Sequence, residues 1–317
     1  MYYVGIDLGG TNIAVGLVDE SGKIVVKKST PTLAQRTAEE IVKDMAKTAI
    51  DVVEEAGITM NEVASVGVAC PGFIEKNLGI LITGANLPFH DYEMRKEMQK
   101  YIDKPIFLDN DANCAAWAEA VAGAAKGVKD SVMITLGTGV GGGIVINGNL
   151  YSGFNFFGAE LGHMVIKVDG NQCGCGRKGC WEAYSSATAL IKLTKEYAEQ
   201  DKSSIMWKMY EEEGKFSGRT SFNAAKLGDK TAQAVVDEYI KYLAAGIANI
   251  ISIFQPEVFV IGGGVSNEGE NLLAPLRIAV EKEKYDGTTS PLFKDCVIVK
   301  ASLGNDAGIV GAALLRE

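Results

Sequence analysis

The sequence predicts an α/β protein made of two related halves. Residues 2–18 read as an apolar strand, a glycine turn and a second apolar strand, and a similar unit returns over residues 132–146, offset by 137 − 9 = 128 positions when Gly137 is laid on Gly9. Apolar strand patterns alternate with helical patterns along the rest of the chain, which is typical of α/β folds. The length of 317 residues suits two domains, and a content of 47% hydrophobic and 22% charged residues suits a folded core.

Local patterns predict the elements of the first half. Gly9 and Gly10 separate the two strands of the first unit and supply the backbone freedom that a tight turn needs. Thr37 and Glu40 have the spacing of a capping box, and apolar residues at helical spacing run from there to Gly57, so we expect an amphipathic helix. Strands over 63–70 and 105–108 and a helix over 112–125 follow.

The second half opens with the repeated unit, whose strands are expected over 132–136 and 143–146. A polar interval over 200–230 predicts short helices and loops. We expect a long helix over 232–253, a buried strand over 258–261 and a last helix over 308–315.

The charge balance excludes several classes of protein. The chain has 31 Lys and Arg against 40 Asp and Glu, a formal net charge of −9, and contains no run of basic residues. We therefore expect no binding to nucleic acid or to an anionic membrane surface. The N-terminus lacks a basic segment followed by an apolar one, and Gly and Asn interrupt the uncharged stretch over 131–159. These features predict a cytoplasmic protein without a signal peptide or a membrane span.

Three glycine loops follow apolar strands and expose backbone N–H groups in the manner of phosphate-binding loops. They are Gly9-Gly10-Thr11, Gly137-Thr138-Gly139 and Gly262-Gly263-Gly264. Each alone is explained by an ordinary tight turn, but together they favour a nucleotide site of neither the Walker nor the Rossmann pattern. Asp7, beside the first loop, is expected either to position Mg²⁺ on phosphate oxygens or to be a turn-forming carboxylate.

The side chains of His163, Cys173, Cys175 and Cys180 predict a metal site. One imidazole and three thiols lie in a short glycine-rich segment, and this donor set selects zinc. With four protein ligands the site has no position for a reactive water, so we expect structural zinc, with unpaired thiols as the alternative. The other three of the six cysteines, Cys70, Cys114 and Cys296, lie in apolar elements and are expected in the core.

Three acidic side chains are candidates for chemistry. Asp111 lies where a strand gives way to a helix, a place equally suited to a helix N-cap and to a general base that takes a proton from an alcohol. Glu160 and Glu182 flank the predicted zinc segment, which would hold them rigidly enough to bind hydroxyl groups. Taken singly, each of these two glutamates would be a solvated surface acid. His90 has no evident partner and is expected in a loop.

Taken together, these motifs resemble the ROK sugar kinases, and among them the bacterial glucokinases. The resemblance spans essentially the whole chain and includes Asp7-Leu8-Gly9-Gly10-Thr11, Cys70-Pro71-Gly72, Asn110-Asp111-Ala112-Asn113, Leu136-Gly137-Thr138-Gly139, Gly158-Ala159-Glu160-Leu161-Gly162-His163 and the cysteine-rich residues 173–182. It implies a duplicated actin/hexokinase-like (ribonuclease H-like) two-domain fold with an interdomain active-site cleft. The smaller domain would comprise residues 1–112 and 303–317, and the larger, zinc-bearing domain residues 113–302.

The resemblance also implies residue roles. Asp111 would be the catalytic base in the ATP-dependent phosphorylation of glucose at its 6-hydroxyl, a step of glycolysis. ATP with Mg²⁺ would lie on the three glycine loops and near Asp7. Sugar hydroxyls would contact Gly72, Asn110, Glu160, His163 and Glu182, with His163 serving zinc as well. Family members also suggest a homodimer.

Three other functions stay open at this stage. One alternative is a kinase for another hexose or N-acetylhexosamine, such as N-acetylmannosamine, N-acetylglucosamine, fructose or allose, because the motifs do not determine which hydroxyls are read. A sugar-responsive transcriptional regulator is less expected, because the sequence shows no helix-turn-helix segment before the strand at Tyr2 and no basic recognition helix. A zinc-stabilised binding module without turnover would require Asp111 to be only an N-cap.

Overall fold

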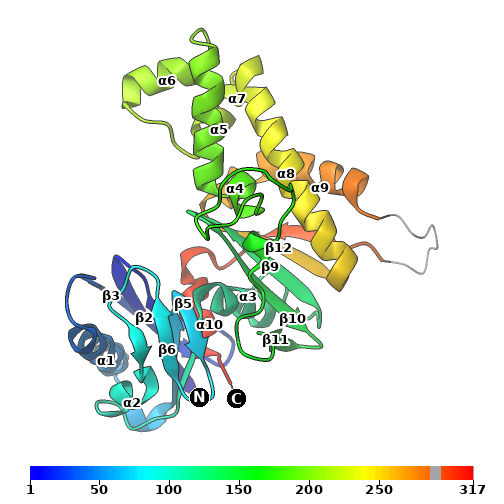
Figure 1. Cartoon of the computed structure of the whole chain (residues 1–317). Helices are drawn as coiled ribbons and strands as arrows, with labels where there is room; N and C mark the ends of the chain where they lie inside the picture. The colour runs from blue at the N-terminus through cyan, green and yellow to red at the C-terminus, as the bar shows by residue number, and fades with distance from the viewer. Residues whose placement is uncertain (286–293, 317) are drawn as a thin grey trace. The chain divides into compact units, whose positions relative to one another are not determined.

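The computed structural model describes residues 1–285 and 294–316, and contains two five-stranded sheets (Figure 1). The first has the strand order β3-β2-β1-β4-β8 and consists of β1 (Tyr2–Leu8), β2 (Asn12–Asp19), β3 (Ile24–Pro31), β4 (Val63–Cys70) and β8 (Ile106–Asn110). The second has the order β11-β10-β9-β12-β13 and consists of β9 (Ser131–Leu136), β10 (Val140–Ile146), β11 (Asn149–Tyr151), β12 (Val258–Gly262) and β13 (Val297–Lys300). A small sheet contains β5 (Gly72–Glu75), β6 (Ile80–Gly84) and β7 (His90–Tyr92).

The two large sheets share one topology. In the first, β1 pairs antiparallel with β2 and parallel with β4, and β4 pairs parallel with β8. In the second, β9 lies between β10 and β12, pairs parallel with β12, and β12 pairs parallel with β13. An outer antiparallel strand completes each order, β3 on β2 and β11 on β10. This repetition confirms the predicted α/β fold of two related halves.

The chain divides into two compact units. The first comprises Met1–Lys129, Gly143–Ala159 and Ser302–Glu317, and the second comprises Asp130–Gly142 and Glu160–Ala301. The C-terminal helix α10 (Ala307–Ala313) thus belongs with the N-terminal sheet. The domain boundaries expected from the sequence stay a prediction, because a division by contacts between residues does not test them.

Helices cover both faces of the first sheet. On one face, α1 (Ala38–Glu55) packs on β2 and β3, and Val4 and Ile6 of β1 join its core. On the other, α10 and α3 (Asp111–Val121) pack together, and α10 contacts β1 and β4. Gly67 permits this approach, since a Cβ there would lie 1.7 Å from the carbonyl oxygen of Ala312. The predicted capping box of Thr37 and Glu40 is present at the start of α1.

Helices of the second unit include the predicted long one. This helix, α8 (Lys230–Phe254), begins after the N-cap Asp229, whose carboxylate accepts from the N–H of Ala232 at 3.0 Å. Trp181 is fully buried against α8, where a Cβ on Gly246 would lie 2.0 Å from the indole ring. The polar interval contains short helices, as predicted. Other α-helices that the structure describes in this unit are α4 (Glu182–Ser185), α5 (Ala187–Gln200), α6 (Ile205–Glu213), α7 (Thr220–Lys226) and α9 (Glu270–Glu283).

Three local expectations differ from the structure. The strand predicted to end at residue 108 continues to Asn110, because Asn110 still pairs with Cys70 of β4. The helix predicted to reach residue 125 ends at Val121, and the N–H of Ala124 donates instead to the carboxylate of Glu119 at 2.7 Å. His90 lies in β7 rather than in a loop, paired with Thr83 of β6.

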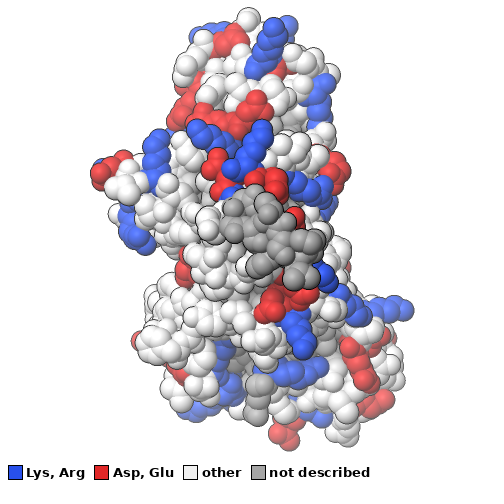
Figure 2. All heavy atoms as spheres, turned by 90° about the vertical axis from the view of Figure 1, so that its right-hand side faces the viewer, with Lys and Arg blue, Asp and Glu red and all other residues white. Residues whose placement is uncertain are grey.

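The surface carries charges of both signs. On the face in Figure 2, Lys and Arg side chains are interspersed with Asp and Glu side chains. Within residues 1–285 and 294–316, no helix combines the length and the apolar character needed to cross a membrane. Cys70 and Cys114 are fully buried, as expected of core cysteines, whereas Cys296 is only half-buried.

Candidate active site

Functional candidates of the first unit gather at one edge of its sheet. Because β1, β4 and β8 are parallel neighbours, their carboxyl ends meet at the same edge, with Asp7 opposite Ala69 and Cys70 opposite Asn110. The first glycine loop follows β1, Gly72 follows β4 after one residue, and Asp111 follows β8. The structure therefore brings together Asp7, Gly9, Gly10, Thr11, Gly72, Asn110 and Asp111.

Asn110, rather than Asp111, is the N-cap of α3. Its side-chain oxygen accepts from the N–H groups of Ala112 at 2.9 Å and Asn113 at 3.4 Å. Its amide nitrogen donates to the carbonyl oxygen of Gly72 at 3.1 Å, which links the ends of β4 and β8. The sequence left two roles open for Asp111, helix N-cap and general base. Because Asn110 is the N-cap, Asp111 does not have the first of these roles.

Asp111 is the first residue of α3 and presents a carboxylate to solvent. One carboxylate oxygen accepts from the N–H of Ala112 at 2.8 Å. The side chain keeps contact with solvent, yet the protein atoms that crowd around it raise the pKa of its carboxyl group above the usual value. An accessible carboxylate of raised basicity can accept a proton from an alcohol.

Asp7 lies close to Asp111 in a less accessible position. Burial raises its pKa from 3.8 to about 6, the charge of Asp111 adds to this effect, and Lys27 opposes it. Gly308 at the start of α10 contributes to the enclosure, because a Cβ there would lie 2.4 Å from the Asp7 carboxylate. Two carboxylates thus share one edge, an arrangement that can bind a divalent cation.

Two glycine loops of the second unit also share an edge. Residues 137–139 follow β9 and residues 263–264 follow β12, and these strands are parallel neighbours with Gly262 opposite Thr135. Gly263 has a φ of 80°, and a Cβ there would lie 2.4 Å from the backbone nitrogen of Leu136, so this position requires glycine. In the loop of residues 137–139, the N–H of Gly137 donates to the carbonyl oxygen of Gly139 at 3.0 Å. The structure therefore brings together Gly137, Thr138, Gly139, Gly262, Gly263 and Gly264.

The predicted zinc ligands converge in the second unit. The donor atoms of His163, Cys173, Cys175 and Cys180 all lie within 4.8 Å of one another. The sulfurs of Cys175 and Cys180 are 3.7 Å apart, and Nδ1 of His163 is 3.7 Å from the Cys173 sulfur. A tetrahedral ion with Zn–S bonds of about 2.3 Å requires sulfurs about 3.8 Å apart, so the cluster is compatible with structural zinc.

Glu182 connects this cluster to a glycine loop. One of its carboxylate oxygens accepts from the N–H of Val140 at 3.0 Å, and the other accepts from the Cys173 thiol at 3.4 Å. Glu160 lies just before the short 3₁₀ helix Leu161–His163, and its backbone carbonyl accepts from the N–H of His163 at 3.0 Å. Both glutamates therefore lie next to proposed zinc ligands in the chain or in space.

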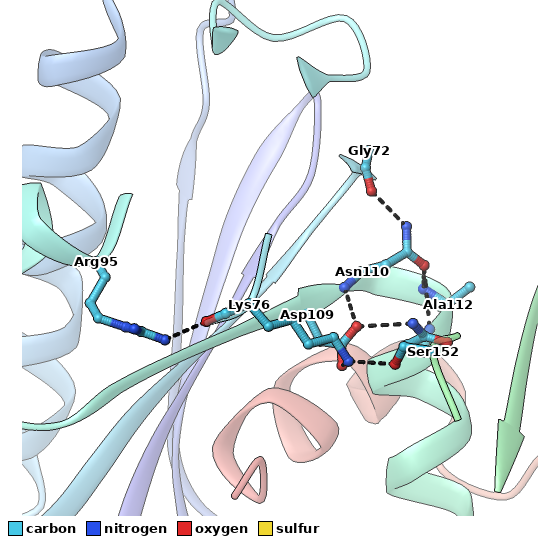
Figure 3. Close-up of polar contacts among 8 residues, drawn as sticks. Gly72, Lys76, Arg95, Asp109, Asn110, Ala112 and Ser152 are labelled. Atoms are coloured by element: carbon cyan, nitrogen blue, oxygen red, sulfur yellow. Dashed lines mark hydrogen bonds and ion pairs between the residues drawn. The ribbon is translucent and has the colours of Figure 1, made fainter. Parts of the chain in front are cut away.

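The sequence gives no separate signal for a polar network around Asp109. The carboxylate of Asp109 forms an ion pair with Lys76 and accepts from Asn113, and Lys76 also donates to Ser152 (Figure 3). Asp109 directly precedes the Asn110-Asp111-Ala112-Asn113 motif, but Lys76 and Ser152 are far from it in sequence and match no pattern.

Fold and site together define a two-domain α/β protein of the actin/hexokinase type. The chain belongs to the ROK family, whose model matches residues 3–317. It is 39% identical to the glucokinase of Thermotoga maritima, over 99% of this chain and 97% of that protein. It is 31% identical to an N-acetylgalactosamine kinase of a Shewanella species, over 99% of this chain and 96% of that protein.

A solved relative extends the comparison to the fold. The structure of a ROK family glucokinase from Streptomyces griseus in complex with glucose and AMPPNP has a TM-score of 0.81 and 34% identity. The match covers 99% of this chain and 98% of that one.

Proposed function

We propose that this protein is an ATP-dependent glucokinase that phosphorylates the 6-hydroxyl of glucose, with Asp111 as general base. All the relatives named above support a sugar kinase, and the two glucokinases support glucose as the sugar. The observation that carries the proposal is the Asp111 carboxylate, which is open to solvent, raised in pKa and spared the role of N-cap because Asn110 fills it. Phosphoryl transfer to an alcohol needs such a group to remove the hydroxyl proton.

The reaction makes modest covalent demands on the protein. The Asp111 carboxylate takes the proton of the 6-hydroxyl while that oxygen forms a bond to the γ-phosphorus of ATP, and the bond from phosphorus to the β,γ-bridging oxygen breaks to release ADP. Positioning and charge stabilisation supply most of the acceleration. We assign ATP binding to the three glycine loops and sugar-hydroxyl contacts to Gly72, Asn110, Glu160, His163 and Glu182.

Two metals are part of the proposal. Mg²⁺ on the phosphates, held near Asp7, would supply positive charge as negative charge develops. Zinc held by His163, Cys173, Cys175 and Cys180 would be structural, keeping Glu160 and Glu182 in place for the sugar. The distances within the cluster support this second assignment.

The first test is ADP release measured with a panel of sugars. Glucose should be the best acceptor among glucose, fructose, allose, N-acetylmannosamine, N-acetylglucosamine and N-acetylgalactosamine. A higher kcat/KM for one of the N-acetylated sugars would replace glucose by that sugar and keep the kinase chemistry. No turnover of any sugar would contradict the proposed function.

The second test is the substitution Asp111→Asn, which removes the proton acceptor and keeps the size of the side chain. We expect sugar binding, measured by calorimetry, to persist while phosphorylation falls by a factor of about 100 to 10,000, the usual contribution of a general base. Wild-type turnover in this variant would exclude Asp111 as the base.

We also propose a cytoplasmic homodimer that acts in glycolysis, as the family resemblance suggests. Light scattering after size-exclusion chromatography would test the dimer, since a single mass near 33.7 kDa would contradict it.

A further inference from the structure

A largely buried ion pair adjoins the turn that carries Asp111. Lys76, in the turn between β5 and β6, forms an ion pair with Asp109, the residue before the N-cap of α3. The Asp109 side chain is only 3% exposed and that of Lys76 22%. Lys76 also donates to the hydroxyl of Ser152 at 2.6 Å. A buried charge with such partners is costly to leave unpaired, so the pair stabilises its surroundings only while both members are present.

The carboxylate oxygen of Asp109 that does not face Lys76 accepts hydrogen bonds from residues on both sides of Asp111 in the chain. It accepts from the backbone N–H of Asn110 at 2.7 Å and from the side-chain amide of Asn113 at 2.9 Å. Asn110 in turn caps α3 and donates to the carbonyl oxygen of Gly72. Asn110 and Asn113, which lie on either side of Asp111 in the chain, are thus both hydrogen-bonded to the Asp109 carboxylate. The charge of that carboxylate is balanced by Lys76 (Figure 3).

Lys76 is itself held in place by Arg95 of α2 (Met94–Gln99). The guanidinium donates to the carbonyl oxygens of Lys76 at 2.7 Å, Asn77 at 2.8 Å and Ile106 at 2.9 Å. This clamp ties the turn that carries Lys76 to strand β8, which carries Asp109. The ammonium group therefore has a defined position relative to the start of α3.

We propose that Lys76 and Asp109 are positioning residues for phosphoryl transfer: their ion pair fixes the turn over residues 109–113 and so the place of the Asp111 carboxylate. This inference rests on the proposed function of Asp111 as general base. Neither residue is required to touch the sugar or ATP. Because rate depends steeply on the placement of the reacting groups, loosening this turn lowers kcat more than it weakens substrate binding.

A cavity gives experimental access to the pair. Lys76 and Asp109 line a cavity of about 700 Å³ within the first unit, together with Arg95, Trp117, Ser152 and Phe156. A small organic cation can therefore reach the space that the Lys76 side chain would vacate. If such a cation restores activity to a variant that lacks the Lys76 side chain, the variant is folded and its defect is the missing positive charge.

The test compares Lys76→Ala, Lys76→Met and Asp109→Asn, with Lys96→Ala as control because Lys96 forms an exposed ion pair with Glu93 on the same helix as Arg95. We expect kcat to fall by roughly 10- to 100-fold in the first three variants, with KM for ATP changed less than about threefold. KM for glucose should rise by a smaller factor than kcat falls, because the same turn carries the proposed sugar contact Asn110. Ethylammonium should raise the kcat of Lys76→Ala several-fold and leave the wild type, Lys76→Met and Lys96→Ala unchanged.

A second measurement does not depend on activity. Hydrogen exchange at the amides of residues 110–113 should become faster in Lys76→Met and Asp109→Asn, with exchange in β1 unchanged. Kinase activity of the wild type tests the proposed function separately from this inference. Unchanged exchange at residues 110–113, a kcat within twofold of the wild type in both Lys76→Met and Asp109→Asn, or a loss of activity seen only in KM would overturn the positioning role. If Lys76→Ala does not fold, Lys76→Met and Asp109→Asn still decide the question.

Discussion

Asp7→Asn should make the first unit more stable near neutral pH while it impairs catalysis. The folded protein raises the pKa of Asp7 from 3.8 to about 6, chiefly by burial. Above pH 6 the side chain is therefore ionised in an environment that disfavours its charge. Asparagine has nearly the same shape and carries no charge, so it escapes this cost.

The size and pH dependence of the effect follow from proton linkage. A difference of about 2 pKa units at about 1.4 kcal/mol per unit corresponds to roughly 3 kcal/mol, an upper limit because solvent screens part of the charge. An acid whose pKa is raised by folding imposes no cost below its unfolded value, because it is protonated in both states. The cost grows as pH rises from about 4 to 6 and is constant above. The gain from Asp7→Asn should therefore be full at pH 7.5 and about half as large at pH 5.

The assay must follow the first unit alone, because a chain with two compact units need not unfold in one step. Hydrogen exchange of the β1 and β4 amides, measured against urea in metal-free buffer, gives the free energy of unfolding of this unit. Asp103→Asn serves as control, because Asp103 is exposed in the same unit, and it should change that free energy by less than about 0.5 kcal/mol. A gain for Asp7→Asn that is absent, or equal at pH 5 and pH 7.5, would refute the assignment of a buried, ionised Asp7.

Two further substitutions test the metal cluster and the C-terminal attachment. Cys175→Ser should lower the zinc content measured by mass spectrometry and weaken glucose binding through displacement of His163, Glu160 and Glu182; full activity without zinc would contradict the structural role. Glu119→Gln should destabilise the first unit by about 1 to 3 kcal/mol, because the buried Glu119 carboxylate accepts from the backbone N–H groups of Ser302 and Leu303, both at 2.8 Å. The exposed Glu54→Gln in the same unit is its control, and equal unfolding free energies for both variants would argue against this clamp.

The sequence could predict elements whose signals are local. The capping box of α1, the strand over 63–70 and the strand–turn–strand repeat all lie within short windows, and the structure has them. The convergence of His163, Cys173, Cys175 and Cys180 was also predictable, because three of these four side chains fall within eight residues. Their donor types and spacing carry the information directly.

Features that depend on contacts between distant segments could not be predicted. Lys76 meets Asp109 and Ser152 across separations of 33 and 76 residues, and no pattern around Lys76 marks it as buried. Likewise, the close fit of Gly67 against Ala312 looks in the sequence like an ordinary strand glycine. The assignment of the N-cap needed coordinates as well, because Asn110 and Asp111 are both good capping residues.

Two copies of one tripeptide differ in how available their aspartate is for chemistry. Asn-Asp-Ala occurs at residues 110–112 and again at 305–307, but Asp111 is the first residue of α3 behind the N-cap Asn110, whereas Asp306 is itself the N-cap of α10. In the second copy, Asp306 forms an ion pair with Lys27, so its charge is already balanced. In the first copy, Lys76 pairs instead with Asp109, one residue before the N-cap, and the Asp111 carboxylate is left to accept a proton. The two aspartates thus differ in chemistry because they hold different helix positions and because a lysine neutralises Asp306 in one copy but Asp109 in the other.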